Sequence, residues 1–186
     1  MPLSGVAELS GGFTTSCQGT LAYWKLAKDG ILAEKDFAPN GVRILFSAVM
    51  PPYQMIFPFS SLAPYKLDGL VKYATLDESL GAVVVNFVIS EARWKKLPES
   101  VQKAMMDAGE ETTRRLCTAP DQDLQTDIAK LKQGGLVTVQ LPAADKKELQ
   151  GLLAGVQTEW AEALDKRGKP GTEVFKAFRA AVQQSR

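Results

Sequence analysis

The sequence predicts an α/β fold in which helices outnumber strands. Three short apolar runs, at 41–49, 82–89 and 136–141, have the length and the β-branched content of strands. The longer segments around them repeat apolar residues at helical spacing. With 186 residues and 45% hydrophobic content, the chain can build a core, and we treat residues 1–186 as a single domain.

The first regular elements are a helix and a strand. Residues 18–28 place apolar and aromatic side chains in a helical setting that Gly30 closes. The strand at 41–49 follows and ends at a Pro-Pro pair. The next stretch is irregular, with two prolines and a serine pair, until helical periodicity returns at 64–73.

The middle of the chain predicts a buried strand followed by a long helix. The run 82–89 is almost wholly apolar, which is typical of a strand covered on both faces. Pro98 marks the start of the helix, because proline suits the first helical turn. We expect Pro120 to interrupt or bend this helix before it stops at the Gly-Gly pair 134–135.

Two helices close the chain. A strand at 136–141 ends at Pro142, and a strong apolar stripe at helical spacing follows it. The stripe consists of Leu149, Leu152, Leu153, Val156, Trp160, Ala163 and Leu164. Glycine and proline at 168–171 end this helix, and a final helix is expected at 174–182.

The residue types exclude most catalytic sites. The chain has no histidine, which removes Ser-His-Asp and Cys-His nucleophiles and histidine metal sites. The phosphate-binding glycine motifs are absent as well. Glu110 and Glu111 lie in the stretch EETTRR beside two arginines, which favours a solvated helix face over acid–base chemistry. We therefore predict no enzyme activity, no cofactor and no metal; an enzyme that uses carboxylates alone is the weakest hypothesis.

Charge and cysteine content give little further direction. The 22 basic and 21 acidic residues leave a net charge of +1, and no block of one sign favours nucleic acid or a membrane surface. The start, MPLSGVAELS, lacks the basic and apolar regions of a secretory signal, so it gives no direct evidence of export. Cys17 and Cys117 are two buried thiols or one disulfide; two cysteines are too few for a disulfide framework, which favours free thiols.

The stretch RWKKLPESVQKAMMDAG at 93–109, which follows the strand at 82–89, carries a family resemblance. A strand, a tryptophan turn, a Leu-Pro step and a long amphipathic helix resemble the C-terminal half of the C4-dicarboxylate-binding type of solute-binding proteins. These proteins serve tripartite ATP-independent periplasmic (TRAP) transporters. Other segments match in the same order, namely PLSGVAELSGGF, LAYWKLAKDGILAEKDF, GVRILFSAVMPPYQM, PYKLDGLVKYATL and LQGLLAGVQTEWAEALDKRGKPGTEVFKAFRA.

The resemblance implies a helix-rich remnant of a periplasmic binding protein type II-like clamp with two lobes. Such a clamp closes on a small carboxylate ligand and delivers it to membrane permease subunits, without catalysis. It implies a periplasmic location. It also implies that the tryptophan turn and the helix after it are scaffold and hold no ligand.

The chain departs from the family pattern in one stretch that matters for binding. In the family, an arginine that pairs with the ligand carboxylate follows the segment similar to GVRILFSAVMPPYQM. Here QMIF runs almost directly into PFSS, so that stretch is absent, and we place a junction of non-adjacent family segments near 56–62. The N-terminal βα units of the family are also missing. We therefore expect a truncated, internally deleted binding protein with impaired or altered ligand capture, because a bidentate arginine is hard to replace.

Three residues are the candidate ligand contacts. Asn86 is an amide in an apolar run, and a buried amide needs hydrogen-bond partners, which neighbouring backbone groups can also supply. Ser90 stands where the family has an asparagine, and Phe13 follows a Gly-Gly pair where the family has a loop at the cleft edge. Arg43 lies in a different strand from the family's arginine, so we do not expect it to contact a ligand.

A rival hypothesis makes the chain an interaction or assembly domain. A deletion would leave a sheet edge open, and an open edge favours pairing with a second copy of the chain. In that case, the protein forms a homodimer in which two partial lobes complete each other's sheets.

Overall fold

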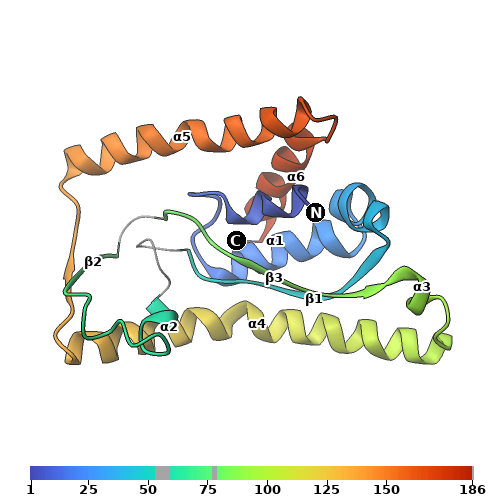
Figure 1. Ribbon diagram of the computed structural model, residues 1–186, viewed down its shortest axis with the longest axis horizontal. Coiled ribbons are helices and arrows are strands. Elements are labelled where there is room, and N and C mark those ends of the chain that lie inside the picture. The colour runs from blue at the N-terminus through green and yellow to red at the C-terminus, as the bar shows by residue number, and fades with distance from the viewer. Residues whose placement is uncertain (53–58, 77–78, 186) are drawn as a thin grey trace.

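The computed structural model describes residues 1–52, 59–76 and 79–185 (Figure 1). Most of the described chain is helical, and the strands are short. In chain order, the elements are η1 (Leu3–Glu8), α1 (Ser16–Lys28), η2 (Ala33–Phe37), η3 (Ala38–Asn40), β1 (Val42–Val49), α2 (Phe59–Leu62), β2 (Tyr73–Thr75), β3 (Val84–Ser90), α3 (Glu91–Trp94), α4 (Glu99–Gln133), β4 (Val137–Val139), α5 (Ala143–Asp165) and α6 (Gly171–Gln184).

The strands form two small sheets. β1 and β3 are antiparallel, with Val42 opposite Ser90 at one end and Val49 opposite Val84 at the other. The parallel pair of β2 and β4 forms the second sheet. The long helix α4 runs beside β1 and α1, while α5 crosses the molecule on the opposite side and α6 packs between α1 and α5 (Figure 1). No helix of the described ranges combines the length and the apolar character that crossing a membrane requires.

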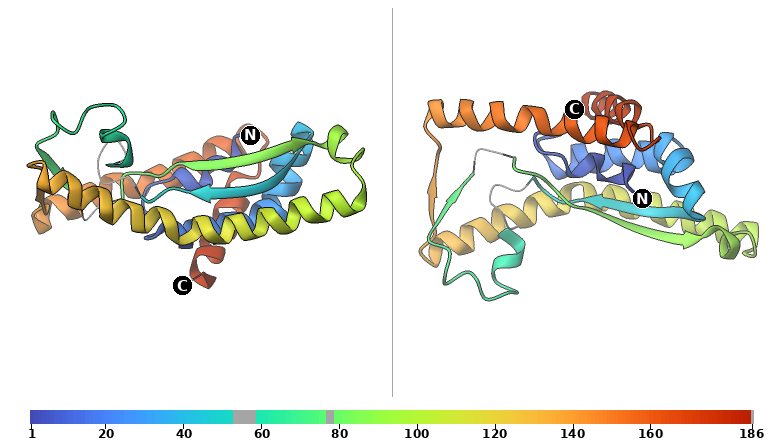
Figure 2. Two further views of the ribbon diagram at one scale, coloured as in Figure 1. Left: turned by 90° about the horizontal axis from the view of Figure 1, so that it is seen from below. Right: turned by 45° about the horizontal axis from the view of Figure 1, so that its top comes forward.

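Two separate clusters of buried apolar side chains hold these elements together. The first core is large and unites η1, α1, β1 and α6 around side chains such as Tyr23, Phe37 and Phe178. The second core is small, and lies where α2, β2 and β4 meet the C-terminal part of α4 (Figure 2). Its buried members are Phe59, Leu62, Ala74, Ile128 and Leu136.

α4 approaches β1 closely because small residues face the strand. A Cβ atom on Gly109 would lie 1.8 Å from the carbonyl oxygen of Leu45, so no other residue fits there without a shift of the backbone. Leu45 is the extra residue at a bulge in β1. One turn further along α4, the Oγ1 of the buried Thr113 accepts a hydrogen bond from the Ser47 N–H at 3.3 Å. The helix thereby supplies the hydrogen-bond acceptor for the Ser47 N–H that a neighbouring strand would supply in a larger sheet.

A disulfide between Cys17 and Cys117 joins α1 to α4. The sequence favoured free thiols, and this interpretation is wrong: the residues lie 100 positions apart, and only the packing of α1 on α4 brings them together. Next to the disulfide, the carboxylate of Asp121 accepts hydrogen bonds from the N–H groups of Ser16 and Cys17, at 2.9 and 3.3 Å. An acidic side chain thus stabilises the N-terminus of α1.

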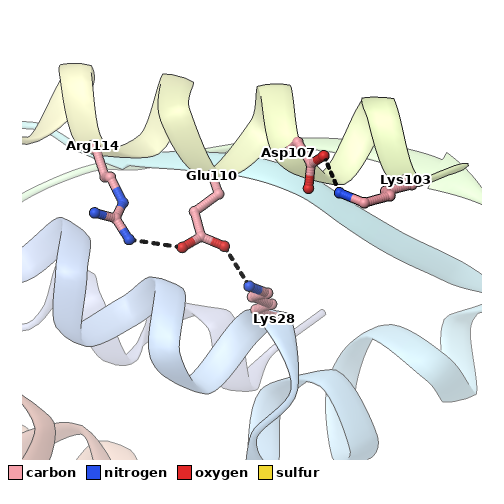
Figure 3. Close-up of polar contacts among 5 residues, drawn as sticks. All are labelled: Lys28, Lys103, Asp107, Glu110 and Arg114. Carbon is pink, nitrogen blue, oxygen red and sulfur yellow. Dashed lines mark hydrogen bonds and ion pairs between the residues drawn. The ribbon is translucent and has the colours of Figure 1, made fainter. Parts of the chain in front are cut away.

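Ion pairs on the surface add to the contact between α1 and α4. Glu110 accepts from Lys28 of α1 at 2.5 Å and from Arg114 of its own helix at 2.9 Å (Figure 3). The two cations lower the pKa of the Glu110 carboxyl, mainly through the hydrogen bond from Lys28. Lys103 and Asp107 form a further pair within α4. The acidic residues of this stretch face cations, as expected for a solvated helix face.

Two predicted elements differ from the structure. α4 is not interrupted at Pro120 and continues as one helix of 35 residues, which the disulfide and the Asp121 contacts fasten to α1 on both sides of the proline. The alternative in that prediction, a bend, agrees with the curved course of α4 in Figure 2. The helix expected at 64–73 is not formed. Lys66 has a left-handed backbone (φ 57°), and the Leu67 N–H donates to the Leu62 carbonyl at 2.8 Å, which ends α2 in a Schellman-type cap.

Two apolar surfaces that the sequence predicted as buried are partly open. β3 was expected to be covered on both faces, yet Val85 and Phe87 expose 40% and 54% of their surface. The stripe along α5 is covered only near its C-terminal end, while Leu152 is 71% exposed. The sequence pattern predicts that the apolar side chains of β3 and α5 are buried, but no described residue covers Val85, Phe87 or Leu152 fully.

Candidate functional site

A cavity of about 450 Å³ lies between the two cores. The segment after β1, the short helix α2 and the middle of α4 provide its walls. The lining residues are Met50, Pro51, Pro52, Phe59, Ser60, Ser61, Val83, Leu116, Pro120, Asp123 and Leu124. A cavity of this size, with apolar walls and a few polar groups, is typical of a site for a small organic molecule.

The charge of this cavity is unusual for a site that would hold an acid. Asp123 is the one charged residue of the described lining, and it makes no ion pair with any described residue. The sequence from Met50 to Tyr65 carries no charged side chain at all. The described walls therefore offer a carboxylate ligand no cationic partner.

Asn86 lies on β3, opposite Ser47 of β1, and faces α1. Its Nδ2 group donates a hydrogen bond to the hydroxyl oxygen of Tyr23 at 3.0 Å. Burial raises the pKa of Tyr23 to about 12, so the phenol stays neutral and can accept this bond. The Oδ1 of Asn86 and the Oγ of Ser47 are buried without a partner among the described residues. The amide oxygen can accept a hydrogen bond and the hydroxyl can donate or accept one, so these opposite positions in the strand register keep unused hydrogen-bonding capacity.

Phe13 lies in the first core, with 5% of its surface exposed. Its ring meets that of Phe178 edge-on, with centroids 6.3 Å apart. A Cβ atom on Gly19 would lie 2.8 Å from the Phe13 ring, so the glycine in α1 makes room for the aromatic side chain. The described surroundings of Phe13 are therefore core packing, and it does not line the cavity.

Ser90 lies at the far end of β3 from the cavity, whose wall includes Val83. Seven residues of extended chain separate them, a span of about 20 Å. The Ser90 hydroxyl accepts from the Arg93 N–H at 3.3 Å and caps α3. The sequence predictions thus name three residues that the structure leaves in three different environments.

Arg43 has a structural role near the start of β1. It donates two hydrogen bonds to the Glu91 carboxylate, at 2.9 and 3.2 Å. Its guanidinium carbon also lies 5.1 Å from the ring centroid of Trp94. These contacts join β1 to the tryptophan turn before α4, which agrees with the predicted scaffold role of that turn.

Sequence reasoning did not find the cavity. One signal was present: Leu116, Pro120, Asp123 and Leu124 follow helical spacing, so they share one face of α4. The opposite wall, around Phe59 and Ser61, reaches that face only through the fold. The described residues also contain no group of three or more acidic or cysteine side chains placed to hold a metal ion.

The sequence matches a family model over more than half of its length. The model describes the bacterial extracellular solute-binding proteins of family 7, and it matches residues 56–164. Curated proteins compared by sequence gave no match.

Solved structures share the fold at low sequence identity. A TRAP periplasmic solute-binding protein from Bordetella bronchiseptica, with bound (R)- and (S)-mandelate, has a TM-score of 0.79 at 17% identity, covering 99% of this chain and 76% of that one. One from Rhodoferax ferrireducens, with copurified benzoate, has a TM-score of 0.80 at 15% identity and coverages of 99% and 75%. One from an unidentified marine microbe, specific for aromatic acids and holding metahydroxyphenylacetate, has a TM-score of 0.83 at 11% identity and coverages of 99% and 76%.

Proposed function

The chain belongs to the bacterial extracellular solute-binding proteins of family 7, which are non-enzymatic periplasmic binding proteins, and from this membership we propose that it captures small organic acids for a TRAP-type transporter. The cavity between the two cores carries the proposal, because it is large enough for a small acid and lies in a fold shared with structures that hold mandelate and benzoate. The partners are a small carboxylate and the membrane permease subunits. C4-dicarboxylates are included in the ligand class by family resemblance.

Capture is impaired or altered in this chain. The family arginine that pairs with the ligand carboxylate is absent, and the described lining of the cavity contains no lysine or arginine. A carboxylate moved from water into apolar walls loses its hydration, and only charge-assisted hydrogen bonds make up that loss fully. An acid bound here is held by contact with its apolar body and by few polar groups, which predicts weak affinity.

An internal deletion near 56–62 explains the missing arginine. The family match begins at residue 56, which falls inside the range where we place the junction. Part of this junction lies outside the described residues, while residues 59–62 form α2. The apolar side chains that α5 exposes, such as Leu152 and Val156, are surfaces that an additional stretch of chain would cover.

Asn86 is the candidate ligand residue with the most geometric support. Its buried Oδ1 has no described partner, but Asn86 does not line the cavity, so we expect it to act on a ligand there through a bridging water. Phe13 and Ser90 stay predictions. Phe13 packs in the first core, and the Ser90 hydroxyl caps α3. Any contact with a ligand would come in addition to these structural roles.

Thermal unfolding against a panel of mono- and dicarboxylates tests this function. A ligand at one hundred times its dissociation constant stabilises the folded protein by about 2.7 kcal/mol. Because we expect weak affinity, stabilisation should appear only at millimolar concentrations of the acid. Asn86→Ala should reduce the ligand-induced shift, measured against the same variant without ligand. Gln125→Ala, an exposed change on α4, is the control and should leave the shift unchanged. Micromolar binding would contradict impaired capture, and no shift with any acid would contradict acid capture itself.

A second function, assembly through a homodimer, has one observation in its favour. At the edge of β1 that does not pair with β3, threonine hydroxyls from the neighbouring helices accept hydrogen bonds from the strand. Thr113 of α4 accepts from the Ser47 N–H, and Thr20 of α1 accepts from the Val49 N–H. β3 pairs with β1 alone among the described strands, and it exposes Phe87. An open, apolar edge strand is a template for pairing with another chain.

Light scattering over a range of concentrations tests the homodimer. The proposal predicts a mass that rises toward two chains, and Phe87→Lys should return it to one. Val137→Lys, on the exposed side of β4, changes the charge equally and should not affect the dimer. A single-chain mass at high concentration would rule the dimer out.

A further inference from the structure

We infer that the tryptophan turn, residues 90–97, is a docking surface for acidic side chains of a protein partner. The inference rests on the proposed function, in which that partner is the permease, and it names the surface by which the two proteins meet. Three observations carry it: exposed cations without ion pairs, a hollow lined by hydrogen-bond donors, and a fixed frame at one end of the molecule.

The turn presents three cations to solvent. Arg93, Lys95 and Lys96 are exposed, and none of them forms an ion pair with a described residue. Glu91, the acid within the turn, accepts two hydrogen bonds from Arg43, so its negative charge is already matched. The surface therefore keeps an excess of positive charge in a chain whose net charge is only +1.

A hollow of about 300 Å³ lies within this turn. Its lining residues are Ser90, Ala92, Arg93, Lys96 and Leu97. The Ser90 hydroxyl accepts from the Arg93 N–H, so its own proton stays available for donation. The lining thus combines three side chains that donate hydrogen bonds with two apolar ones, and it contains no acid. Such a set of donors, two of them charged, suits a carboxylate.

The rest of the fold holds the turn in place. Trp94 is buried, with 7% of its surface exposed, and the Arg43 guanidinium lies over its ring. The side chain of Gln102, on α4, donates to the carbonyl oxygens of Trp94 and Leu97, both at 3.0 Å. A backbone fixed in this way loses little conformational freedom when a partner binds, which favours docking.

The position of the turn separates it from the proposed solute site. The turn lies at one end of the long axis of the molecule, away from α2 and β2 (Figure 1). Val83, in the described wall of the cavity, lies beyond the other end of β3, about 20 Å of extended chain from Ser90. A partner can therefore contact the turn without touching the described walls of the cavity.

A protein fits the turn better than an anionic membrane does. Attraction to anionic lipids is typical of clusters of about four to eight lysines and arginines, and the turn has three. The aromatic side chain that could anchor the turn in a bilayer, Trp94, is buried in the protein. The hollow instead offers Arg93 and Lys96 to a single carboxylate, which matches an aspartate or glutamate on a protein surface.

The turn between α5 and α6 provides a matched control. Lys166 and Arg167 are exposed there, form no ion pair with a described residue and do not line the hollow. Each turn also has one nearby acid outside the described ion pairs, which is Glu99 in one case and Asp165 in the other. Replacement of one arginine and one lysine thus changes the charge equally at the two places.

Titration with an acidic peptide tests the docking surface. The probe alternates glutamate with glycine and has blocked ends, so that side-chain carboxylates are its only charges, and the same peptide with glutamine is its control. We expect backbone amide signals of residues 90–97 to shift in NMR spectra, with an affinity that falls as salt is added. Arg93→Gln with Lys96→Gln should weaken binding about three- to tenfold, and Lys166→Gln with Arg167→Gln less than about twofold.

The outcomes decide between partners. Equal losses in the two double variants would overturn the inference, because binding would then follow net charge alone, and so would a lack of peptide binding. Vesicles of phosphatidylcholine and phosphatidylglycerol that shift the signals of 90–97 when the peptide does not would replace the protein partner by a membrane. Malonate or benzoate that shifts these signals as strongly as the peptide would make the turn a solute site and overturn docking.

Thermal unfolding with organic acids keeps this inference separate from the proposed function. The Arg93→Gln, Lys96→Gln variant should retain the acid-induced stabilisation of the unchanged protein, because its substitutions lie outside the described cavity wall. Loss of that stabilisation in the variant alone would place the acid at the turn and overturn docking. No acid-induced stabilisation of the unchanged protein would contradict acid capture, and the peptide titration would still decide whether the turn is a docking surface.

Discussion

The two cores differ greatly in the number of side chains that support them. Among the described residues, the first contains 20 buried apolar side chains and the second contains five. The same helix, α4, contributes to both regions, but its buried residues are unevenly placed. Gly109, Thr113 and Cys117 face the first region, and Ile128 alone is buried in the second. A region with so few buried contacts is expected to open at a lower free energy than the rest of the molecule.

This difference matters for binding because the cavity lies between the cores. One wall belongs to the segment that leaves β1, and the other includes Phe59 and Leu124 of the second region. A ligand that bridges both walls stabilises the weaker region by mass action. If the cavity is the ligand site, as proposed, we therefore expect ligand capture to be coupled to the order of the second region.

Removal of the disulfide should have the largest effect on the stronger region. Cys17 and Cys117 close a loop of about 100 residues, for which loss of the cross-link costs about 5 kcal/mol. We expect the double variant Cys17→Ser, Cys117→Ser to unfold at a lower guanidinium concentration than the oxidised protein. Reduced wild-type protein is the control and should behave like the variant. Equal stability of oxidised and reduced protein, with two titratable thiols, would restore the free-thiol interpretation.

A matched pair of leucine truncations compares the cores directly. Leu32 and Leu62 are both fully buried, one in each core. Leu32→Ala should cost about 4 kcal/mol of global stability and Leu62→Ala about 2 kcal/mol, because the thinner cluster can collapse around the missing atoms. Hydrogen exchange should rise after Leu62→Ala only within 59–76 and 124–139. A rise throughout α1 would mean that the two cores unfold as one unit.

The glycine where α4 meets β1 tests the close packing of the first region. Gly109→Ala would place a Cβ atom against the Leu45 carbonyl and force α4 away from the strand. We expect a loss of about 1–3 kcal/mol in urea unfolding, the usual cost of overpacking. Gly151→Ala on α5 is the matched control, since no heavy atom lies within 4 Å of its added Cβ. That change should stabilise the helix by up to about 1 kcal/mol.

Much of the fold could be predicted from local patterns. The apolar runs located β1, β3 and β4, and Pro98 located the start of α4. Local signals failed where distant contacts decide. Pro120 did not interrupt α4, which the disulfide and Asp121 hold to α1 on either side of the proline. The helix expected at 64–73 does not form because Lys66 adopts a left-handed backbone conformation that caps α2. Helix propensity gives no sign of such a cap.

The candidate site was less predictable than the fold. Asn86 was visible as an amide in an apolar run, but its partner Tyr23 lies 63 positions away, and only the packing of α1 on the sheet reveals it. The cavity is formed by segments that no sequence pattern relates, from Met50 to Leu124. The absence of basic residues from Met50 to Tyr65 can be read from the sequence, but its bearing on the cavity follows only from the lining positions at 50–52 and 59–61.

The smallest expected effect concerns the surface pair between α1 and α4. Lys28 and Arg114 lower the pKa of Glu110 below its ordinary value of 4.5, so the folded state favours the ionised carboxylate. The stability gained is therefore fully present above about pH 4.5 and is lost as the pH falls through the lower, folded-state pKa. A double-mutant cycle with Lys28→Met and Glu110→Gln should give a coupling of about 0.2–1 kcal/mol at pH 7 and almost none at pH 2.5. A coupling that persists in acid would show that the two side chains interact by apolar contact and not as an ion pair. The stability of the first region would then come from its core and its disulfide, without an electrostatic contribution from this pair.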